Sequence, residues 1–389
     1  MSTTPLLDGI NVLNLASVGP AARAARTLAD YGAGVVQVGP VAKSGSVQIA
    51  PPYHTYGAGR GFKHISIDMK SAAGREGFLR LAENSDVIIE SFRPGVVDRL
   101  GIGYADVSAR NPGIVYCSTT GYGQNGPAAS WAGHDINYLA MSGFLACTEP
   151  RADGGPPIPG ATVADSAGGG MHAAMSIMAA LVKRNTSGEG SFLDVSATEG
   201  VLSLMALSID QYLATGEVAG PREVLLTGRY AFYDLYPTKD DKWVSVGAIE
   251  PKFYANLCNA LGLPQYVKSQ TDDALQSEIR EAFKQVFLTK TRDEWTQALA
   301  SNDTCVAPVL TIPELVEEPH HAARKIFMQA VHDEHGEFRQ VGPILSGGVR
   351  DQPTHHVEPI GSSDAPQLLA AAGYDTAEIE KLSAEGTIE

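Results

Sequence analysis

Short apolar runs alternate with stretches of helical pattern along the first part of the chain. The runs NVLNL, GVVQVG and DVIIES are bounded by turn residues, as strands are. A helical pattern follows the first run, with Pro20 near its first turn and Gly32 placed to end it. Strand, helix and strand at this spacing predict βαβ units, and therefore an α/β fold with a parallel sheet covered by helices on both faces. The expected strands are 11–15, 34–39, 64–69, 86–91 and 114–120, and the expected helices between them include 20–31 and 71–85.

The pattern becomes mainly helical from residue 132 onward. We expect helices over 135–147, 165–184 and 198–215, with a strand over 190–197 between the last two. The most apolar helical stretch, 171–183, is shorter than the ~20 residues that a membrane-spanning helix needs. The sequence therefore predicts no membrane partner.

A third region differs from the rest. Residues 230–249 form two β-rich runs around the polar turn Lys239–Lys242, which predicts a hairpin. Further on, Thr291 and Glu294 have the spacing of a capping box at a helix start. We expect a large α/β domain over 1–200 completed by 340–389, a linker helix region over 201–224, and a small α+β domain over 225–330.

Composition and charge narrow the class of partner. The 389 residues carry a formal net charge of −15, which argues against nucleic acid as the main partner. The four cysteines are far apart without metal-ligand spacing, so we expect neither a zinc site nor a disulfide framework, and no other metal motif is present. The N-terminus lacks the pattern of a secretory signal. We therefore expect a soluble, cytoplasmic protein.

The stretch GYGQNG (121–126) fits the spacing of a dinucleotide-binding glycine loop. Such a loop must open directly into a helix, whose N-terminus meets the pyrophosphate. Here a turn-like segment beginning at Pro127 follows instead. We therefore favour a loop whose backbone approaches some other ligand, and keep a nicotinamide-dependent oxidoreductase as a minor alternative.

Basic residues near predicted strand ends are candidates for an anion site. Ligands of open α/β sheets bind beyond the carboxyl ends of the strands, and Arg93 directly follows one such strand. The alternative is an ordinary solvated face, which is common for scattered cations. The residues concerned are Arg60, Lys63, Lys70, Arg93 and Arg99.

Three acidic residues and one histidine allow either a structural or a catalytic interpretation. Asp135 and Asp165 each stand at a predicted helix start, where aspartate is a common cap. Glu250 precedes a helix that begins with proline, where an acid interacts favourably with the helix dipole. His134 has no such structural explanation, and imidazole is the usual group for moving protons near neutral pH.

Taken together, several stretches resemble one known family. They are LADYGAGVVQV, SFRPGVVDRLGIG, TGYGQNGP, AGHDINYLAMSG, VGAIEPKFY and DTCVAPVL, spread over most of the chain. With them the chain resembles the family III CoA-transferase superfamily (CaiB/BaiF-like), and within it the α-methylacyl-CoA racemase branch. GHDINY together with VGAIEP is typical of that branch.

The resemblance implies a fold and a set of roles. The family fold is an interlocked homodimer with a Rossmann-like large domain and a small domain, and each active site lies between the two subunits. His134 and Asp165 match the acid/base pair, and Glu250 matches the glutamate that pairs with the histidine, here from the partner chain. The positions that match the CoA-binding and substrate-binding residues are Ile67, Asp68, Met69, Lys70, Arg93, Arg99, Gly133, Asp135, Ile136, Asn137 and Tyr138.

The implied reaction is inversion of the α-carbon of a 2-methyl-branched acyl-CoA. A thioester acidifies its α-proton, and inversion needs a base on one face and an acid on the other. The helix start at 135–138 offers backbone N–H groups for the enolate oxygen. CoA is part of the substrate, and no further cofactor is implied. The alternative is a CoA transferase on the same fold, with Asp165 as the nucleophile.

The chain departs from the family pattern at several positions. Gly39-Pro40 stand where an Asp-Arg pair is common, and Arg60-Gly-Phe-Lys63 replaces Arg-Gly-Lys-Arg. These changes, with the unfamiliar loop 40–58, bear on the contacts to the CoA phosphates. Ser166 replaces a common aromatic residue, and the stretch with Arg229 and Tyr230 replaces a glycine-rich one. We therefore expect a preferred acyl chain that differs from the usual one.

Overall fold

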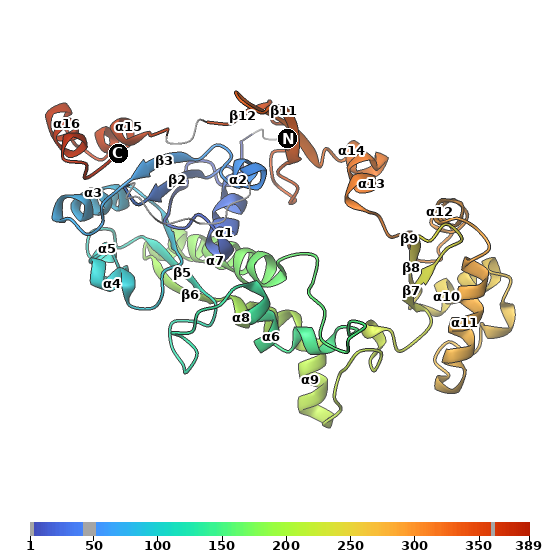
Figure 1. Cartoon of the computed structure of the whole chain (residues 1–389). Helices are drawn as coiled ribbons and strands as arrows, with labels where there is room; N and C mark the ends of the chain where they lie inside the picture. The colour runs from blue at the N-terminus through green and yellow to red at the C-terminus, as the bar shows by residue number, and fades with distance from the viewer. Residues whose placement is uncertain (1–3, 42–51, 359–361) are drawn as a thin grey trace. The chain divides into compact units, whose positions relative to one another are not determined.

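One parallel sheet forms the centre of the larger part of the protein. The computed structural model describes residues 4–41, 52–358 and 362–389, and within them six strands follow the order β3-β2-β1-β4-β5-β6 (Figure 1). All neighbouring strands are parallel, which confirms the predicted α/β class. This is the Rossmann order, with its switch point between β1 and β4. The strands are β1 Asn11–Asn14, β2 Gly34–Gly39, β3 Lys63–Ser66, β4 Val87–Glu90, β5 Val115–Thr120 and β6 Ser191–Ser196.

Alternate residues of the strands build two separate apolar cores. In β4, Val87 and Ile89 face one core, whereas Ile88 faces the other. Both faces are buried, so the strands appear in the sequence as continuous apolar runs. The first core includes residues of α1 (Gly19–Asp30) and α7 (His172–Ser187). The second includes residues of α3 (Ala72–Glu83), α5 (Tyr104–Ser108), α15 (Ala365–Ala371) and α16 (Thr376–Ala384).

The C-terminal part of the chain returns to this sheet. Ile388 forms a bridge with Ile67, just beyond the end of β3, which is shorter than the predicted strand 64–69. A three-stranded sheet that the sequence pattern did not indicate precedes it, in the order β11-β10-β12. Its strands are β10 Phe327–His332, β11 Gly336–Val341 and β12 His355–His356. Helix α2 (Pro52–Ala58) contacts β11. The remaining helices of the larger part of the protein are α4 Val96–Leu100 and α14 Pro319–Ala323.

The predicted middle helices exist, but none of them is a single regular α-helix. The first consists of α6 (Asp135–Met141) and a 3₁₀ turn (Phe144–Cys147), separated at Gly143, whose φ is +80°. The second begins as a π-helix (Ala164–Met171) that continues into α7. The third is divided into α8 (Ala197–Leu204) and α9 (Ala206–Thr215).

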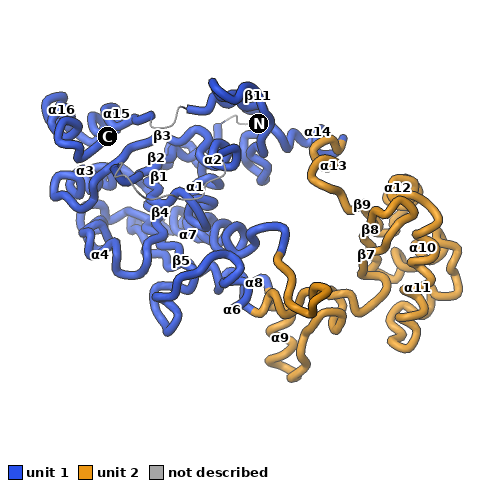
Figure 2. Tube along the Cα trace, viewed as in Figure 1, with its two compact units in different colours: residues 1–142, 159–204, 319–389 blue, residues 143–158, 205–318 orange. Residues whose placement is uncertain are grey.

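The described chain divides into two compact units (Figure 2). Unit 1 comprises residues 1–142, 159–204 and 319–389, apart from the undescribed stretches, and contains both sheets described above. Unit 2 comprises residues 143–158 and 205–318. No helix among the described residues is long and apolar enough to span a bilayer.

Unit 2 contains a small antiparallel sheet covered by helices. The predicted hairpin is present as β7 (Tyr233–Pro237) and β8 (Trp243–Gly247), and β9 (Val306–Pro308) pairs with β8. Its core includes the buried aromatic residues Tyr236, Phe283 and Trp295. Besides α9 and the 3₁₀ turn Phe144–Cys147, unit 2 contains α10 Pro251–Ala260, α11 Gln276–Phe287, α12 Arg292–Leu299 and α13 Ile312–Glu317, with 3₁₀ turns at Leu225–Thr227, Pro264–Tyr266 and Asp273–Leu275.

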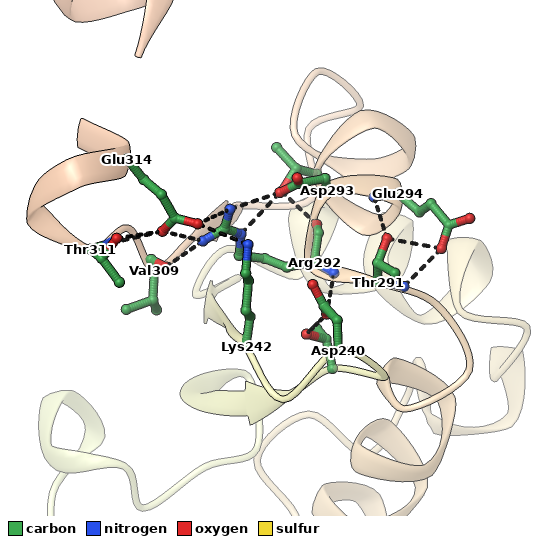
Figure 3. Close-up of polar contacts among 11 residues, drawn as sticks. Asp240, Lys242, Thr291, Arg292, Asp293, Glu294, Val309, Thr311 and Glu314 are labelled. Atoms are coloured by element: carbon green, nitrogen blue, oxygen red, sulfur yellow. Dashed lines mark hydrogen bonds and ion pairs between the residues drawn. The ribbon is translucent and has the colours of Figure 1, made fainter. Parts of the chain in front are cut away.

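A buried arginine joins several of these elements (Figure 3). Arg292, only 4% exposed, donates to both carboxylate oxygens of Glu314 at 2.8 and 2.9 Å and to the Val309 carbonyl at 3.1 Å. These contacts hold the pKa of Glu314 well below its usual range. The capping box predicted for α12 is confirmed, because the Thr291 amide donates to Glu294 at 2.8 Å and the Glu294 amide to the Thr291 hydroxyl at 3.3 Å.

Candidate active site

The start of α6 is built around His134 rather than Asp135. His134 is the N-cap, with extended backbone at φ −128° and ψ 177°, and its amide donates to the Asn137 side chain at 3.0 Å. Asp135 is the first helical residue, so the prediction that its side chain caps α6 is wrong. The His134 side chain is exposed, which leaves its imidazole accessible to a ligand.

Asp135 instead links α6 to the turn that carries Asp165. Its carboxylate accepts a hydrogen bond from the Asp165 backbone N–H at 2.9 Å. Asp165 is therefore the residue that is capped, and its own carboxylate is left for other contacts. The link brings together two helix starts that are thirty residues apart in the sequence.

The glycines after Asp165 allow the π-helix to pack closely against its neighbours. A Cβ added at Gly169 would lie 2.5 Å from Pro20, and one at Gly170 would lie 2.5 Å from the Arg23 side chain. Gly168 packs equally closely against α8. The glycine run thus places Asp165 beside the N-terminal half of α1, which is how Arg23 comes near it.

The surroundings of Asp165, burial first, favour its protonated form overall. Desolvation and the negative charge of Asp135 raise the pKa of Asp165, while Arg23 and His134 act in the opposite direction. A carboxyl group with a raised pKa is a better general base once ionised, and a usable general acid when protonated. His134 contributes to this electrostatic balance, so the two groups belong to one local site.

Tyr138 fixes the loop before α6. Its hydroxyl donates to the Gly133 carbonyl at 2.5 Å, and burial raises the pKa of Tyr138 to about 12. Gly121 lies against the ring so closely that an added Cβ would be 2.1 Å from Cε1. Tyr122 packs edge-on at 5.2 Å between ring centroids. The GYGQNG loop therefore packs against α6, and no helix opens directly after it, as the dinucleotide fingerprint would require.

The sequence analysis missed a buried carboxyl at the end of β4. Glu90 is only 1% exposed. Its carboxylate accepts hydrogen bonds from the Phe92 amide, at 2.6 Å, and from the Ser118 hydroxyl. The side-chain amide of Gln124 donates to that hydroxyl at 2.7 Å. Burial raises the pKa of Glu90 to about 7. The signal was a glutamate within an otherwise apolar strand, which is rare unless the acid has partners.

The predicted CoA-binding residues outside α6 and its loop follow the ends of β3 and β4, two strands that β2 and β1 separate in the sheet. Ile67 is buried and Asp68 accepts from the Lys70 amide at 3.1 Å, whereas Lys70 itself is exposed. Arg93 and Arg99 are exposed, in the loop after β4 and in α4. Their exposure leaves them accessible to an anionic ligand.

The amides at the start of α6 are only partly available. Asn137 and Tyr138 donate to the His134 carbonyl at 2.8 and 3.4 Å, so the expectation of free N–H groups throughout 135–138 is wrong. The backbone N–H groups of Asp135 and Ile136 donate to no acceptor within the described parts of the chain. Asp135 and Ile136 remain the candidate donors.

Arg60 has a structural role. It is 7% exposed, bonds Asp30 at 2.8 Å, and donates to the Val341 carbonyl at 3.1 Å. It therefore does not form an exposed anion site with Lys63, which is exposed at the start of β3. Most of the unfamiliar loop at 40–58, residues 42–51, lies outside the described residues.

Glu250 belongs to unit 2. It is the N-cap of α10, yet its exposed side chain makes no capping hydrogen bond. The interpretation as a helix cap thus holds for its backbone only.

Arg229, also in unit 2, is bonded to Asp273 at 2.8 Å and lies over the Tyr230 ring.

A cavity of about 680 Å³ opens beside Asp165 within unit 1. Its lining comes from one side of α1, from α2 and from β11, and includes Arg23, His54 and Phe338. Within the described ranges, no cluster of three His, Cys, Asp or Glu side chains is arranged to hold a metal ion.

The family model for CoA-transferase family III matches residues 7–361. The chain belongs to that family. Human alpha-methylacyl-CoA racemase is 35% identical over 98% of this chain and 97% of its own length. Succinyl-CoA–D-citramalate CoA-transferase of Chloroflexus aurantiacus is 30% identical over 88% and 89%. The crystal structure of a CaiB/BaiF family protein from Brucella suis is 26% identical over 83% of this chain and 89% of that one, with a TM-score of 0.70.

The resemblance inferred from the sequence motifs is thereby confirmed. Family III includes relatives named as racemases and relatives named as CoA transferases. Family membership alone therefore does not distinguish between these two reactions.

Proposed function

We propose that this family III protein is a racemase that inverts the α-carbon of 2-methyl-branched acyl-CoA thioesters. The observation that supports the proposal best is the Asp135–Asp165 hydrogen bond, because it joins the helix start that directly follows His134 to the turn that carries Asp165. A transferase needs the aspartate alone, so a histidine at the same site is an additional group that only proton transfer uses.

The reaction needs two groups of opposite protonation. One, as base, takes the α-proton, and the C–H electron pair moves to form an enolate whose charge rests on the thioester oxygen. The other, as acid, delivers a proton to the opposite face of the α-carbon, and the C=O bond is restored. His134 and Asp165 exchange these roles when the direction reverses. CoA is part of the substrate, so the step requires no other cofactor.

The enolate oxygen requires donors that are already oriented. We assign this role to the backbone N–H groups of Asp135 and Ile136. The bonds of Tyr138 to Gly133 and of Asp135 to Asp165 hold this segment in place. The exposed cations Lys70, Arg93 and Arg99 are the proposed contacts of the CoA phosphates.

Glu250 completes the proposed site from a second subunit. In an interlocked homodimer, the carboxylate of unit 2 in one chain would accept from the imidazole of His134 in the other. Such a bond would fix the imidazole tautomer and raise its basicity. The free side chain of Glu250 at the start of α10 supports this role.

Solvent exchange tests the proposal. A single 2-methylacyl-CoA incubated with the protein in D₂O should gain deuterium at the α-carbon, measured by NMR or mass spectrometry, while an enantiopure ester becomes racemic. If no exchange occurs and CoA passes instead to an added carboxylic acid, the protein is a transferase.

The location of Asp165 supports the transferase as a second candidate. Asp165 lines the cavity, where a carboxylic acid could bind beside it. Asp165 would attack the thioester carbon and expel the CoA thiolate to give a mixed anhydride. The thiolate would then attack the aspartyl carbonyl, release the first carboxylic acid and form an aspartyl-CoA thioester. A second carboxylate would attack that thioester to form a new anhydride, and the released thiolate would attack its acyl carbonyl to give the new acyl-CoA and free Asp165. Hydroxylamine trapping would convert Asp165 to a hydroxamate, detectable by peptide mass, only if this anhydride forms.

A further inference from the structure

The cavity beside Asp165 has an unusual concentration of positive charge for a chain with a net charge of −15. Arg23, Arg26 and Arg60 line it, against the carboxylates of Asp30 and Asp165. Since the pKa of Asp165 is raised, this acid neutralises less of the surrounding charge than an ordinary carboxylate. The lining therefore favours an anion.

Two of the arginines share one acid. Arg26 and Arg60 lie 2.9 and 2.8 Å from the same oxygen of Asp30. One carboxylate between two guanidinium groups leaves a net positive charge in a largely buried place, where it is screened little by solvent. An incoming carboxylate would balance this charge.

Buried donors in the same lining lack acceptors. Within the described residues, Nε of Arg26 and Nε2 of Gln340 are buried and bond to no protein acceptor. Gln340 is 9% exposed, and its Oε1 is already an acceptor for Arg60 at 3.4 Å. A buried donor without a partner is costly, so an oxygen-rich ligand group that reached these two atoms after a small side-chain shift would satisfy both.

Arg23 extends this positive surface toward Asp165. It lies one turn before Arg26 on the same face of α1, an axial rise of about 5 Å. Its guanidinium bonds only weakly to the Thr162 hydroxyl, at 3.4 Å, and acts electrostatically on Asp165. The cations thus form a row along α1 that starts near the proposed reacting group and leads away from it.

We propose that this cavity binds the acyl part of the substrate, and that the acyl chain ends in a carboxylate held by Arg23 and by the Arg26–Arg60–Gln340 cluster. The preferred substrate is then the CoA thioester of a 2-methyl dicarboxylic acid. This inference rests on the proposed racemase function, since Asp165 would act on the α-carbon while the distal carboxylate lies along α1.

Two esters of equal chain length separate charge recognition from catalysis. We expect α-deuterium exchange with 2-methyladipyl-CoA to exceed that with 2-methylhexanoyl-CoA by at least tenfold in kcat/KM. Arg23→Met should reduce this ratio about tenfold, mainly through KM, and Arg23→Lys should restore most of it. Because loss of the Arg23 charge also affects Asp165 equally for both esters, the ratio is the informative quantity. Arg80→Met, on α3 away from the cavity, is the matched control.

Binding measurements distinguish the remaining explanations. Dissociation constants of both esters and of free CoA, measured by calorimetry, should show the same preference and the same loss in Arg23→Met. Equal weakening of all three ligands would mean that the cavity holds CoA phosphates, and would overturn the proposal, as would a preference for the methyl-ended ester. If neither ester exchanges but the binding preference persists, the racemase function fails while the carboxylate site stands.

Discussion

The Asp135 carboxylate accepts a hydrogen bond from the Asp165 backbone N–H at 2.9 Å. The acid that begins one helix thereby caps the turn that carries Asp165, the proposed reacting acid, and its negative charge also raises the pKa of Asp165. The sequence pattern predicted that these two acids are separate helix caps. In the structure they form one pair, and His134 directly precedes Asp135 in the chain.

Removing the charge of Asp135 should change the pH profile. In Asp135→Asn the side-chain oxygen can still accept from the Asp165 amide, but the negative charge that raises the pKa of Asp165 is lost. The pKa of Asp165 should then fall, so the carboxylate base forms at lower pH. The acid limb of kcat/KM for deuterium exchange should move to lower pH. Asp8→Asn, an exposed site, should leave the limb in place.

Loss of the imidazole should remove exchange. His134→Ala is expected to lower kcat for α-deuterium exchange by roughly 10²-fold or more, the usual contribution of a general acid or base. Circular dichroism should show an unchanged fold because the side chain is exposed. His356→Ala serves as the matched control, and equal activity of the two variants would contradict the assigned role.

Subunit complementation would test the shared site. His134→Ala and Glu250→Gln should each be inactive alone, but co-expression should recover about a quarter of wild-type exchange, because half of randomly paired dimers contain one intact site of two. Recovery requires that the two residues of one site come from different chains. No recovery in purified mixed dimers would place both residues of each site in the same chain.

Gly121 should not tolerate a larger side chain. In Gly121→Ala the new Cβ would lie 2.1 Å from the Tyr138 ring, so the ring and the start of α6 must move. Overpacking of this kind costs about 1–3 kcal/mol, and we expect a matching fall in the free energy of unfolding together with reduced exchange. In Gly160→Ala the new Cβ meets nothing within 4 Å, and both quantities should stay at wild-type values.

Buried Glu90 should make stability depend on pH. Its pKa is raised from 4.5 to about 7, so the folded state holds this proton more tightly than the unfolded state. The free energy of unfolding should therefore fall as pH rises from 4.5 through 7, by about 3 kcal/mol. Glu90→Gln mimics the protonated acid, so its free energy of unfolding should not show this fall between pH 5 and pH 8.5 in denaturation experiments. Glu199→Gln, at an exposed site, should retain it.

The sequence alone determined the main elements of the fold. Apolar runs such as DVIIES and turn residues such as Gly32 act over a few neighbours, so the parallel strands and the helices between them could be predicted. The capping box at Thr291 and Glu294 is equally local, and the structure contains it. The family motifs also indicated that the stretch around His134 is a candidate part of the site.

Tertiary structure decided which side chains meet. The partner of Asp135 is an amide thirty residues away, and the room for Tyr138 comes from Gly121, so no local pattern could reveal either. The sequence pattern indicated Arg60 as one of the exposed candidate cations, whereas in the structure it bonds to Asp30 and Val341. Glu90 and the arginines along α1 acquire their chemistry from burial, which depends on how distant segments pack. Local periodicity specifies helices and strands, whereas charge pairing and desolvation depend on three-dimensional neighbours.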